Sequence, residues 1–109
     1  MEYNILSKKM HEIRQQNSLQ QKELADAIGV NPPMYSKFET GKRLIQLEQL
    51  ESFASHCCYS FKELKVLWLA DRISHTLNRY NISNEEYQNA ISVINNEINE
   101  YGNKQAIAD

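Results

Sequence analysis

The sequence predicts an all-α protein of five helices with a sixth helix added toward the C-terminal end. The chain has 109 residues, 41% of them hydrophobic, which is enough for one domain with a small core. It contains only three glycines and two prolines. Leu, Glu, Lys, Gln and Ala, which favour helices, are abundant, and apolar residues recur at spacings of three and four. These observations exclude a disordered chain and favour a helical one.

The first two helices are expected up to Asn17 and from about Gln20 to Ile28. Gly29 stands where a helix commonly ends in a left-handed backbone conformation. The residues at near-helical spacing in the first helix include Ile5, Met10 and Ile13, and the apolar face of the second consists of Leu24, Ala25 and Ile28.

Two consecutive prolines mark the start of the third helix. Asn31 is the expected N-cap, and Pro32 and Pro33 occupy positions whose N–H groups have no acceptor within the helix. The cap oxygen must then reach the N–H of Met34. This helix is expected to run to about Thr40, with Gly41 stopping it. Tyr35 and Phe38 are predicted to face inward, and Pro33, Met34, Ser36 and Lys37 to face largely outward.

A fourth helix is predicted from about Leu47 to Cys57, and a fifth from Ser60, its cap, to about Tyr80. Ser60 and Glu63 form a capping box at the start of the fifth helix. Two apolar stripes follow, the first made of Phe61, Leu64, Leu67 and Trp68, and the second of Val66, Leu69, Ala70, Ile73, Leu77 and Tyr80. One stripe suffices to close a five-helix core, so the second needs another cover.

A capping box of Ser83 and Glu86 starts the last helix, which we expect Gly102 to end. Its apolar seam consists of Tyr87, Ile91, Ile94, Ile98 and Tyr101. This seam spans barely two heptads, so the helix either folds onto the fifth helix or stands free as a zipper. The chain therefore divides into a domain at 1–80, an amphipathic helix for packing or dimerisation at 81–103, and a tail at 104–109.

Charge is distributed unevenly along the chain. The formal net charge is −2, but residues 1–45 carry seven Lys or Arg against five acids, and residues 46–109 carry five against nine. Such an asymmetry suits an anionic partner for the first half, although solvated charges also segregate by chance. No apolar run approaches a membrane span and no signal peptide begins the chain, so we expect a cytoplasmic protein with no membrane partner.

Residues His56, Cys57 and Cys58 could suggest a metal site. Zinc needs about four ligands at suitable spacing, however, and there is no second Cys/His cluster. The apolar spacing assigns Cys57 to the core instead. No catalytic triad, glycine-rich phosphate loop or paired-carboxylate cleft is discernible. We therefore predict no metal, no cofactor and no enzymatic activity.

Three segments carry a resemblance to a known family. IRQQNSLQQKELADAIGV is followed by MYSKFETGKR and, after the fourth helix, by YSFKEL. Together, from roughly Ile5 to Leu64, they resemble the Cro and phage-repressor-like (Xre-type) helix-turn-helix proteins. The resemblance implies a five-helix lambda-repressor-like fold for residues 1–80, with an added C-terminal helix, and double-stranded DNA as the partner.

The resemblance also implies roles for particular residues. Gln21 is similar to a glutamine that anchors a phosphate and braces the next helix, and the loop around Thr40 to Arg43 matches a segment that lies along the DNA backbone. The helix facing the bases has no Arg, Asn or Gln, the side chains best suited to bidentate contacts with bases. Lys37 is then its one clear donor or, alternatively, a solvated surface lysine. The candidate DNA-binding residues are Gln21, Lys22, Asn31, Pro32, Pro33, Met34, Ser36, Lys37, Thr40, Lys42 and Arg43.

Two hypotheses for function follow. The first is a homodimeric, sequence-specific transcriptional regulator, a repressor that occupies an operator with half-sites one DNA turn apart. The second is a helix-turn-helix protein-interaction module, antitoxin-like or accessory to a modification enzyme, with weak DNA binding. The predicted dimerisation residues are Leu69, Ile73, Leu77, Tyr80, Tyr87, Ile91, Ile94 and Ile98.

Overall fold

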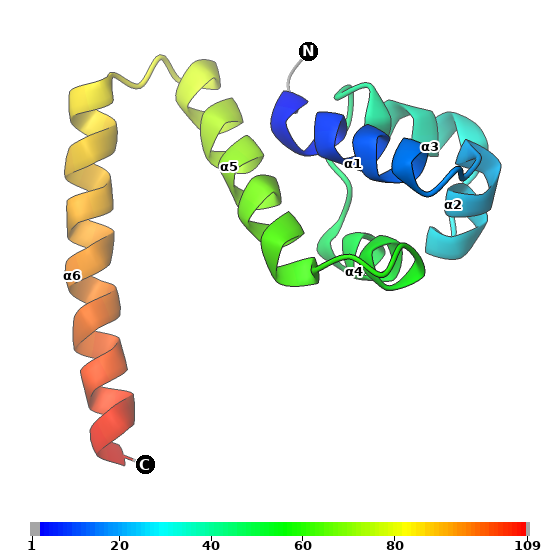
Figure 1. The fold of residues 1–109 in the computed structure, drawn as a ribbon. Helices are drawn as coiled ribbons and strands as arrows, with labels where there is room; N and C mark the ends of the chain where they lie inside the picture. The colour runs from blue at the N-terminus through cyan, green and yellow to red at the C-terminus, as the bar shows by residue number, and fades with distance from the viewer. Residues whose placement is uncertain (1–2, 109) are drawn as a thin grey trace. The chain divides into compact units, whose positions relative to one another are not determined.

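The computed structural model describes residues 3–108, and their side chains up to residue 97. Within this part of the chain all the regular structure is helical, which confirms the predicted fold class. The helices are α1 (Asn4–Gln16), α2 (Gln21–Ile28), α3 (Pro32–Glu39), α4 (Leu47–His56), α5 (Phe61–Arg79) and α6 (Asn84–Ala108) (Figure 1). None of the helices described is long and apolar enough to cross a membrane. The chain forms two compact units, residues 1–75 and 76–109, which are described separately.

The first unit has one apolar core, and α1, α2, α3, α4 and the first half of α5 all contribute residues to it. Tyr35 and Phe38, predicted to face inward from α3, are buried, as is Cys57 at the end of α4. The buried apolar residues are Leu6, Met10, Ile13, Leu24, Ala25, Ile28, Tyr35, Phe38, Ile45, Leu50, Phe53, Ala54, Cys57 and Leu64.

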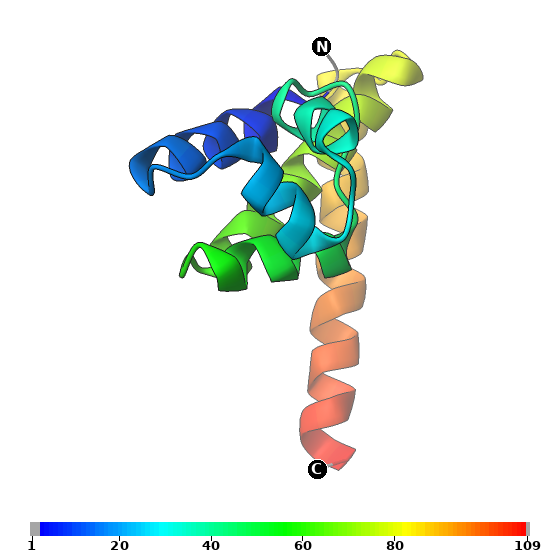
Figure 2. The same ribbon diagram turned by 90° about the vertical axis from the view of Figure 1, so that its right-hand side faces the viewer.

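The signals that begin and end α2 and α3 are those expected. Gly29 ends α2 in the left-handed conformation, with φ 78°, and a short turn leads into α3 (Figure 2). The Asn31 side chain accepts a hydrogen bond from the Met34 N–H at 2.8 Å, which confirms the predicted cap. Gln20 precedes α2 without a side-chain cap, so this helix depends more on tertiary packing for its stability.

The start of α1 is capped by a residue 65 positions away. The Asp71 carboxylate, 1% exposed, accepts hydrogen bonds from the backbone N–H groups of Ile5 at 3.1 Å and Leu6 at 2.8 Å. Tyr3, the residue at the N-cap position of α1, makes no side-chain cap bond. Asp71 therefore fastens α5 to α1 while satisfying N–H groups that have no partner within the helix.

Along α5, the first apolar stripe closes the core as predicted. Leu64 is fully buried, and Phe61, Leu67 and Trp68 pack against the core. The Trp68 indole Nε1–H donates to the Ile45 carbonyl at 2.7 Å, which holds the ring in place. The second stripe starts with Val66, which is exposed.

In the second unit, α5 ends in a tight turn. The Ile82 N–H donates to the Leu77 carbonyl at 2.9 Å, and Asn81 takes the left-handed conformation with φ 52°. The Ser83 and Glu86 capping box forms in both directions, at 2.8 and 3.1 Å, as predicted.

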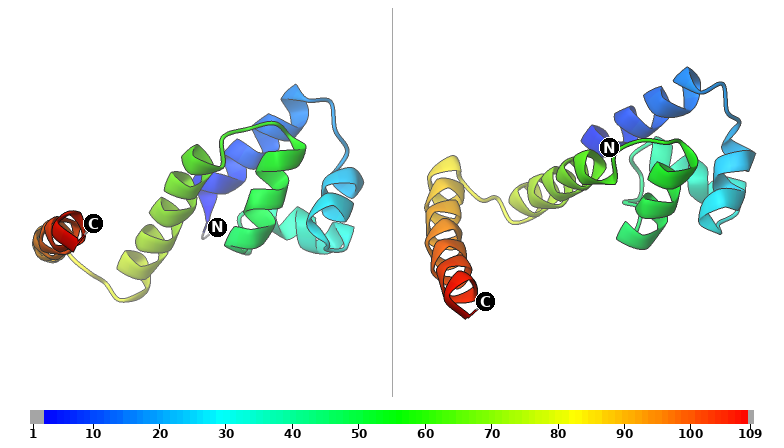
Figure 3. Two further views of the ribbon diagram at one scale, coloured as in Figure 1. Left: turned by 90° about the horizontal axis from the view of Figure 1, so that it is seen from below. Right: turned by 60° about the horizontal axis from the view of Figure 1, so that its bottom comes forward.

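The C-terminal helix is longer than the sequence suggested. Figure 3 shows α6 as one continuous helix, and it runs to Ala108, through Gly102, where we expected it to end. The predicted tail at 104–109 is therefore wrong for residues 104–108, and Asp109 lies outside the described part. An interior glycine costs a helix only about 1 kcal/mol, and the good helix formers Lys104, Gln105 and Ala106 follow it.

Candidate functional site

The outer face of α3 and its N-cap presents several of the candidate DNA-binding residues. Asn31, Pro32, Pro33 and Lys37 are exposed, and Ser36 is half-buried. Because Tyr35 and Phe38 point into the core, the orientation of this face is fixed by packing. The structure thus brings Pro32, Pro33, Ser36 and Lys37 together on a single helix.

A buried carboxylate lies behind this face. The side chain of Glu39, 3% exposed, receives Arg14 Nε at 2.6 Å on one oxygen and Arg14 Nη2 at 3.2 Å on the other. The Tyr35 hydroxyl donates to it at 2.8 Å, the Gln21 amide at 3.0 Å, and His11 Nδ1 lies 3.2 Å away. Through this one carboxylate, α1 and α2 are both bonded to α3.

The network keeps Glu39 ionised. Burial alone would raise the pKa of Glu39, but hydrogen bonds from Arg14, Tyr35, His11 and Gln21 outweigh it and hold this pKa below its usual value of 4.5. The hydrogen bond to Glu39 also raises the pKa of Arg14. The pair is therefore a fixed ionic clamp at neutral pH.

Gln21 and Lys22 lie at the start of α2. The expectation that Gln21 braces the next helix is confirmed by its bond to Glu39. The amide nitrogen of this half-buried side chain points toward Glu39. A contact of Gln21 with a DNA phosphate stays a prediction. Lys22 is exposed on the same turn.

The loop after α3 is anchored at Gly41, which has φ 77°. Its carbonyl accepts the Tyr3 N–H at 3.1 Å, and a Cβ at this position would lie 3.0 Å from the Tyr3 carbonyl oxygen. The backbone N–H groups of Lys42 and Arg43 both donate to the Lys37 carbonyl, at 3.0 and 3.3 Å. These bonds hold three basic residues close together at the end of α3.

Met34 differs from its predicted outward orientation. It is half-buried against the core, and its sulfur lies 3.7 Å from Arg43 Nη1. The helix turns Met34 toward the groove between α3 and the following loop because Val30, Phe38 and Leu44 provide an apolar wall there. Thr40 is exposed, and its hydroxyl donates to the Ser36 carbonyl at 2.9 Å.

The segment His56–Cys58, which the sequence raised as a possible metal site, has its side chains in other environments. His56 Nε2 lies 2.8 Å from a Glu23 carboxylate oxygen, and burial raises the pKa of Cys57 to about 11. Cys58 is exposed with φ 53°, a left-handed conformation that costs a residue other than glycine about 1 kcal/mol. Among the residues described, no three His, Cys, Asp or Glu side chains gather as metal ligands would.

The predicted dimerisation residues differ in exposure. Leu69 is 52% exposed, Tyr80 64% and Ile94 49%, which is unusual for large apolar side chains. Ile73, Leu77, Tyr87 and Ile91 are half-buried. The side chain of Ile98 lies outside the part that the structure describes.

Sequence reasoning missed two buried acids, Glu39 and Asp71, together with Arg14. Each acid lies on the apolar face of its helix, Glu39 four residues after Tyr35 and Asp71 seven after Leu64. A charged residue at a core position requires partners, so this placement was the signal available in the sequence.

Comparison with known proteins agrees with this geometry. A family model described as "Helix-turn-helix" matches residues 10–64. No curated protein matches the chain. Two crystal structures of the clp gene regulator ClgR from Corynebacterium glutamicum are similar in fold at 21% identity. One has a TM-score of 0.55 over 64% of this chain and 91% of that one. The other has a TM-score of 0.56 over 74% and 83%. Because this family model matches half of its length, the chain belongs to the Xre/lambda-repressor-like family of helix-turn-helix DNA-binding regulators.

Proposed function

We propose that the protein is a dimeric transcriptional regulator that represses by occupying a specific site on double-stranded DNA. The observation that carries this proposal is the outer face of α3. There an exposed Lys37 stands beside Ser36 and two prolines, on a helix that buried bonds to Glu39 hold in one orientation. A preorganised helix pays little ordering entropy on binding.

With α3 in the major groove, each side chain has a distinct part. Lys37 can donate to guanine O6 or N7, Ser36 can donate or accept, and Pro32 and Pro33 offer apolar contact to thymine methyl groups. The prolines also remove two N–H groups that a helix N-terminus offers to a phosphate. Phosphate contacts therefore depend on Lys22, Lys42, Arg43 and Gln21, none of which reads sequence.

A single face with one strong donor gives limited specificity. Two copies related by a two-fold axis double the number of bases read, with half-sites about 34 Å apart. The apolar side chains left exposed on α5 and α6, such as Leu69 and Ile94, supply the surface for pairing.

The first test is selection from a random duplex DNA pool at about 0.15 M salt, with salt held fixed because phosphate contacts depend steeply on it. We expect enrichment of a two-fold-symmetric site. Recovery of no preferred sequence would contradict specific DNA binding.

A pair of substitutions then tests α3 on the selected site. Lys37→Ala should weaken specific binding by roughly thirtyfold or more, since the dimer loses two base contacts that are each worth about 1–3 kcal/mol. Lys37→Arg keeps the charge and donors and should retain most of the affinity. Binding to a scrambled duplex should change much less, and an equal loss on both duplexes would assign Lys37 to the phosphate backbone.

The interaction module remains the second candidate. It is favoured by the excess of acids in residues 46–109 and by the absence of Arg and Gln from α3. If the double substitution of Lys37 and Arg43 leaves a protein complex intact while the wild type selects no DNA site, the module is the correct function.

A further inference from the structure

The loop between α3 and α4, residues 40–46, carries the exposed side chains of Lys42 and Arg43. In the proposed function both side chains contact DNA phosphates. Ordering a loose loop and its long side chains costs free energy on binding, so a loop that is already held in place binds a phosphate more tightly. The contacts that hold residues 40–46, which we call the α3–α4 loop, therefore bear on DNA affinity.

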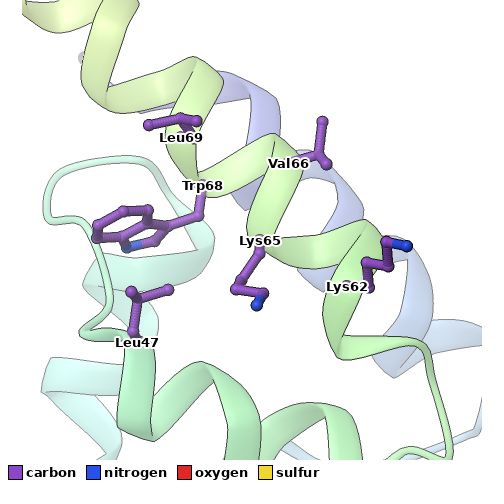
Figure 4. A pocket seen from close by; sticks show the side chains of 6 residues that line it. All are labelled: Leu47, Lys62, Lys65, Val66, Trp68 and Leu69. Atoms are coloured by element: carbon purple, nitrogen blue, oxygen red, sulfur yellow. The ribbon is translucent and has the colours of Figure 1, made fainter. Parts of the chain in front are cut away.

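One end of the α3–α4 loop is attached directly to α5. The Trp68 indole donates its Nε1–H to the Ile45 carbonyl at 2.7 Å, and the Ile45 side chain is buried. Figure 4 shows the Trp68 ring beside Leu47, the first residue of α4, and both side chains line one apolar pocket. Ile45 lies between the two helices, so this bond fixes a backbone group outside their hydrogen-bond ladders.

The other end of the loop is attached to α5 through the segment that leads into α1. The Tyr3 N–H donates to the Gly41 carbonyl at 3.1 Å, and the Tyr3 ring lies 5.0 Å from the ring of His75 on α5. The buried carboxylate of Asp71, also on α5, accepts two N–H groups from the first turn of α1. Through Tyr3, these two residues of α5 hold the loop at Gly41.

A single helix thus holds the loop at two points, Gly41 and Ile45. Trp68 and Asp71 are three residues apart on α5, so their side chains point to the same side of the helix, one turn apart. The segment between the two attachments is residues 42–44, which includes both basic side chains. Its backbone can therefore move little unless α5 or the segment before α1 moves as well.

We propose that α5 positions the α3–α4 loop for the DNA backbone, which makes Trp68 and Asp71 positioning residues for Lys42 and Arg43. Neither Trp68 nor Asp71 is among the residues proposed to touch DNA, so their effect on affinity passes through the loop. The inference rests on the proposed function, in which the two basic side chains neutralise phosphates. It implies that a change in α5 weakens DNA binding while the base-reading face of α3 stays in place.

Two conservative substitutions in the full-length protein test the two attachments separately. Trp68→Phe keeps an apolar ring and removes the N–H donor, and Asp71→Asn keeps the shape but removes the charge and one acceptor oxygen. Both are measured at a temperature where circular dichroism shows the variant to be folded. Each should bind the selected duplex and a scrambled duplex about fivefold to tenfold more weakly at about 0.15 M salt, since contacts to phosphates do not read sequence.

A double-mutant cycle shows whether the loss passes through the loop. Lys42→Ala should weaken binding clearly less in Trp68→Phe than in the wild type, because the lysine of the loosened loop has already lost part of its contact. Ser52→Ala is the matched control. It also removes a side-chain donor to a backbone carbonyl, that of Glu48, at an exposed position on α4. It should leave the affinity and the effect of Lys42→Ala unchanged.

Amide hydrogen exchange in the free protein tests the positioning without DNA. The backbone N–H groups of Lys42 and Arg43 donate to the Lys37 carbonyl, and their exchange reports how often the loop opens. In Trp68→Phe this exchange should accelerate more than that of the Leu24 N–H in α2. Equal acceleration at both places would show a loss of global stability and would overturn the positioning role.

The outcomes distinguish this inference from the proposed function. A wild type that binds neither duplex would remove DNA binding and the inference together. If Lys42→Ala weakens binding but Trp68→Phe and Asp71→Asn bind like the wild type, the positioning role is overturned and DNA binding stands. Losses in the cycle that simply multiply would do the same. A loss on the selected duplex alone would show that α5 acts through α3 rather than through the loop.

Discussion

At the scale of single residues, the most consequential side chain is Glu39. It is a charge in the core, which is tolerated only because four side chains bond to it. Those partners come from α1, α2 and α3, so the carboxylate does not merely stabilise one helix. It sets the position of α3 relative to the two helices before it.

Glu39→Gln should therefore destabilise the protein by about 2–4 kcal/mol at pH 7, since Arg14 would lose its ionic partner. Because the folded-state pKa of Glu39 is lowered, its contribution to stability is present above the ordinary value of 4.5 and is lost as the pH falls through the folded-state value. Urea unfolding between pH 3 and 7 should show that the wild type loses stability as the pH falls and that Glu39→Gln loses less. Glu51→Gln, an exposed carboxylate, should behave like the wild type.

Gly41 and Gly29 have nearly the same φ but different surroundings. Gly29→Ala meets nothing within 4 Å and should cost only the backbone strain, about 1 kcal/mol. Gly41→Ala adds a contact of 3.0 Å with the Tyr3 carbonyl and should cost about 2 kcal/mol or more. Denaturant midpoints compare the stability of the two variants. Equal losses of stability would show that the backbone near Tyr3 moves aside without a cost in free energy.

At the scale of helices, the local sequence predicted where a helix begins better than where it ends. The caps at Asn31 and Ser83 were readable because one side chain reaches a backbone N–H three residues ahead. The end of α6 was misplaced because Gly102 does not by itself stop a helix whose following residues favour it. The cap of α1 could not be read locally at all, since it comes from Asp71.

Asp71→Ala should destabilise the protein by about 2–3 kcal/mol, because two N–H groups lose a charged acceptor in a buried place. Asp71→Asn retains one acceptor oxygen and should lose less. Amide hydrogen exchange at Ile5 and Leu6 should accelerate in Asp71→Ala more than at residues of α4. Uniform acceleration throughout the first unit would instead indicate that only global stability had changed.

At the scale of the whole molecule, the sequence established much of the fold and the outer face of α3. Periodicity placed Tyr35 and Phe38 in the core, which left Lys37 and Ser36 outside. The sequence did not predict the interior of the site, since three of the four partners of Glu39, namely Gln21, Arg14 and His11, are 18 to 28 residues distant in sequence. The inward turn of Met34 likewise depends on Val30 and Leu44, which only the folded chain brings to it.

The uneven charge of the chain gives a prediction about salt. If Lys22, Lys42 and Arg43 each neutralise one phosphate in both copies of the proposed dimer, the logarithm of the binding constant should fall linearly with the logarithm of the salt concentration, with a slope of about −5. Lys42→Ala should reduce the slope by about 2, because each dimer loses two contacts. Fluorescence anisotropy from 0.05 to 0.3 M salt measures both values. An unchanged slope would exclude Lys42 from the backbone contacts.

The bond between Tyr3 and Gly41 has a practical consequence for how the protein is handled. Anything fused to the amino end must leave the folded domain at Tyr3, directly beside the loop that carries Lys42 and Arg43. If that loop lies along the DNA backbone as proposed, a purification tag left there would compete with DNA for the same space. A small fluorophore at the same end would instead lie where arriving DNA alters its surroundings, so the amino terminus is a poor place for a tag and a good one for a reporter.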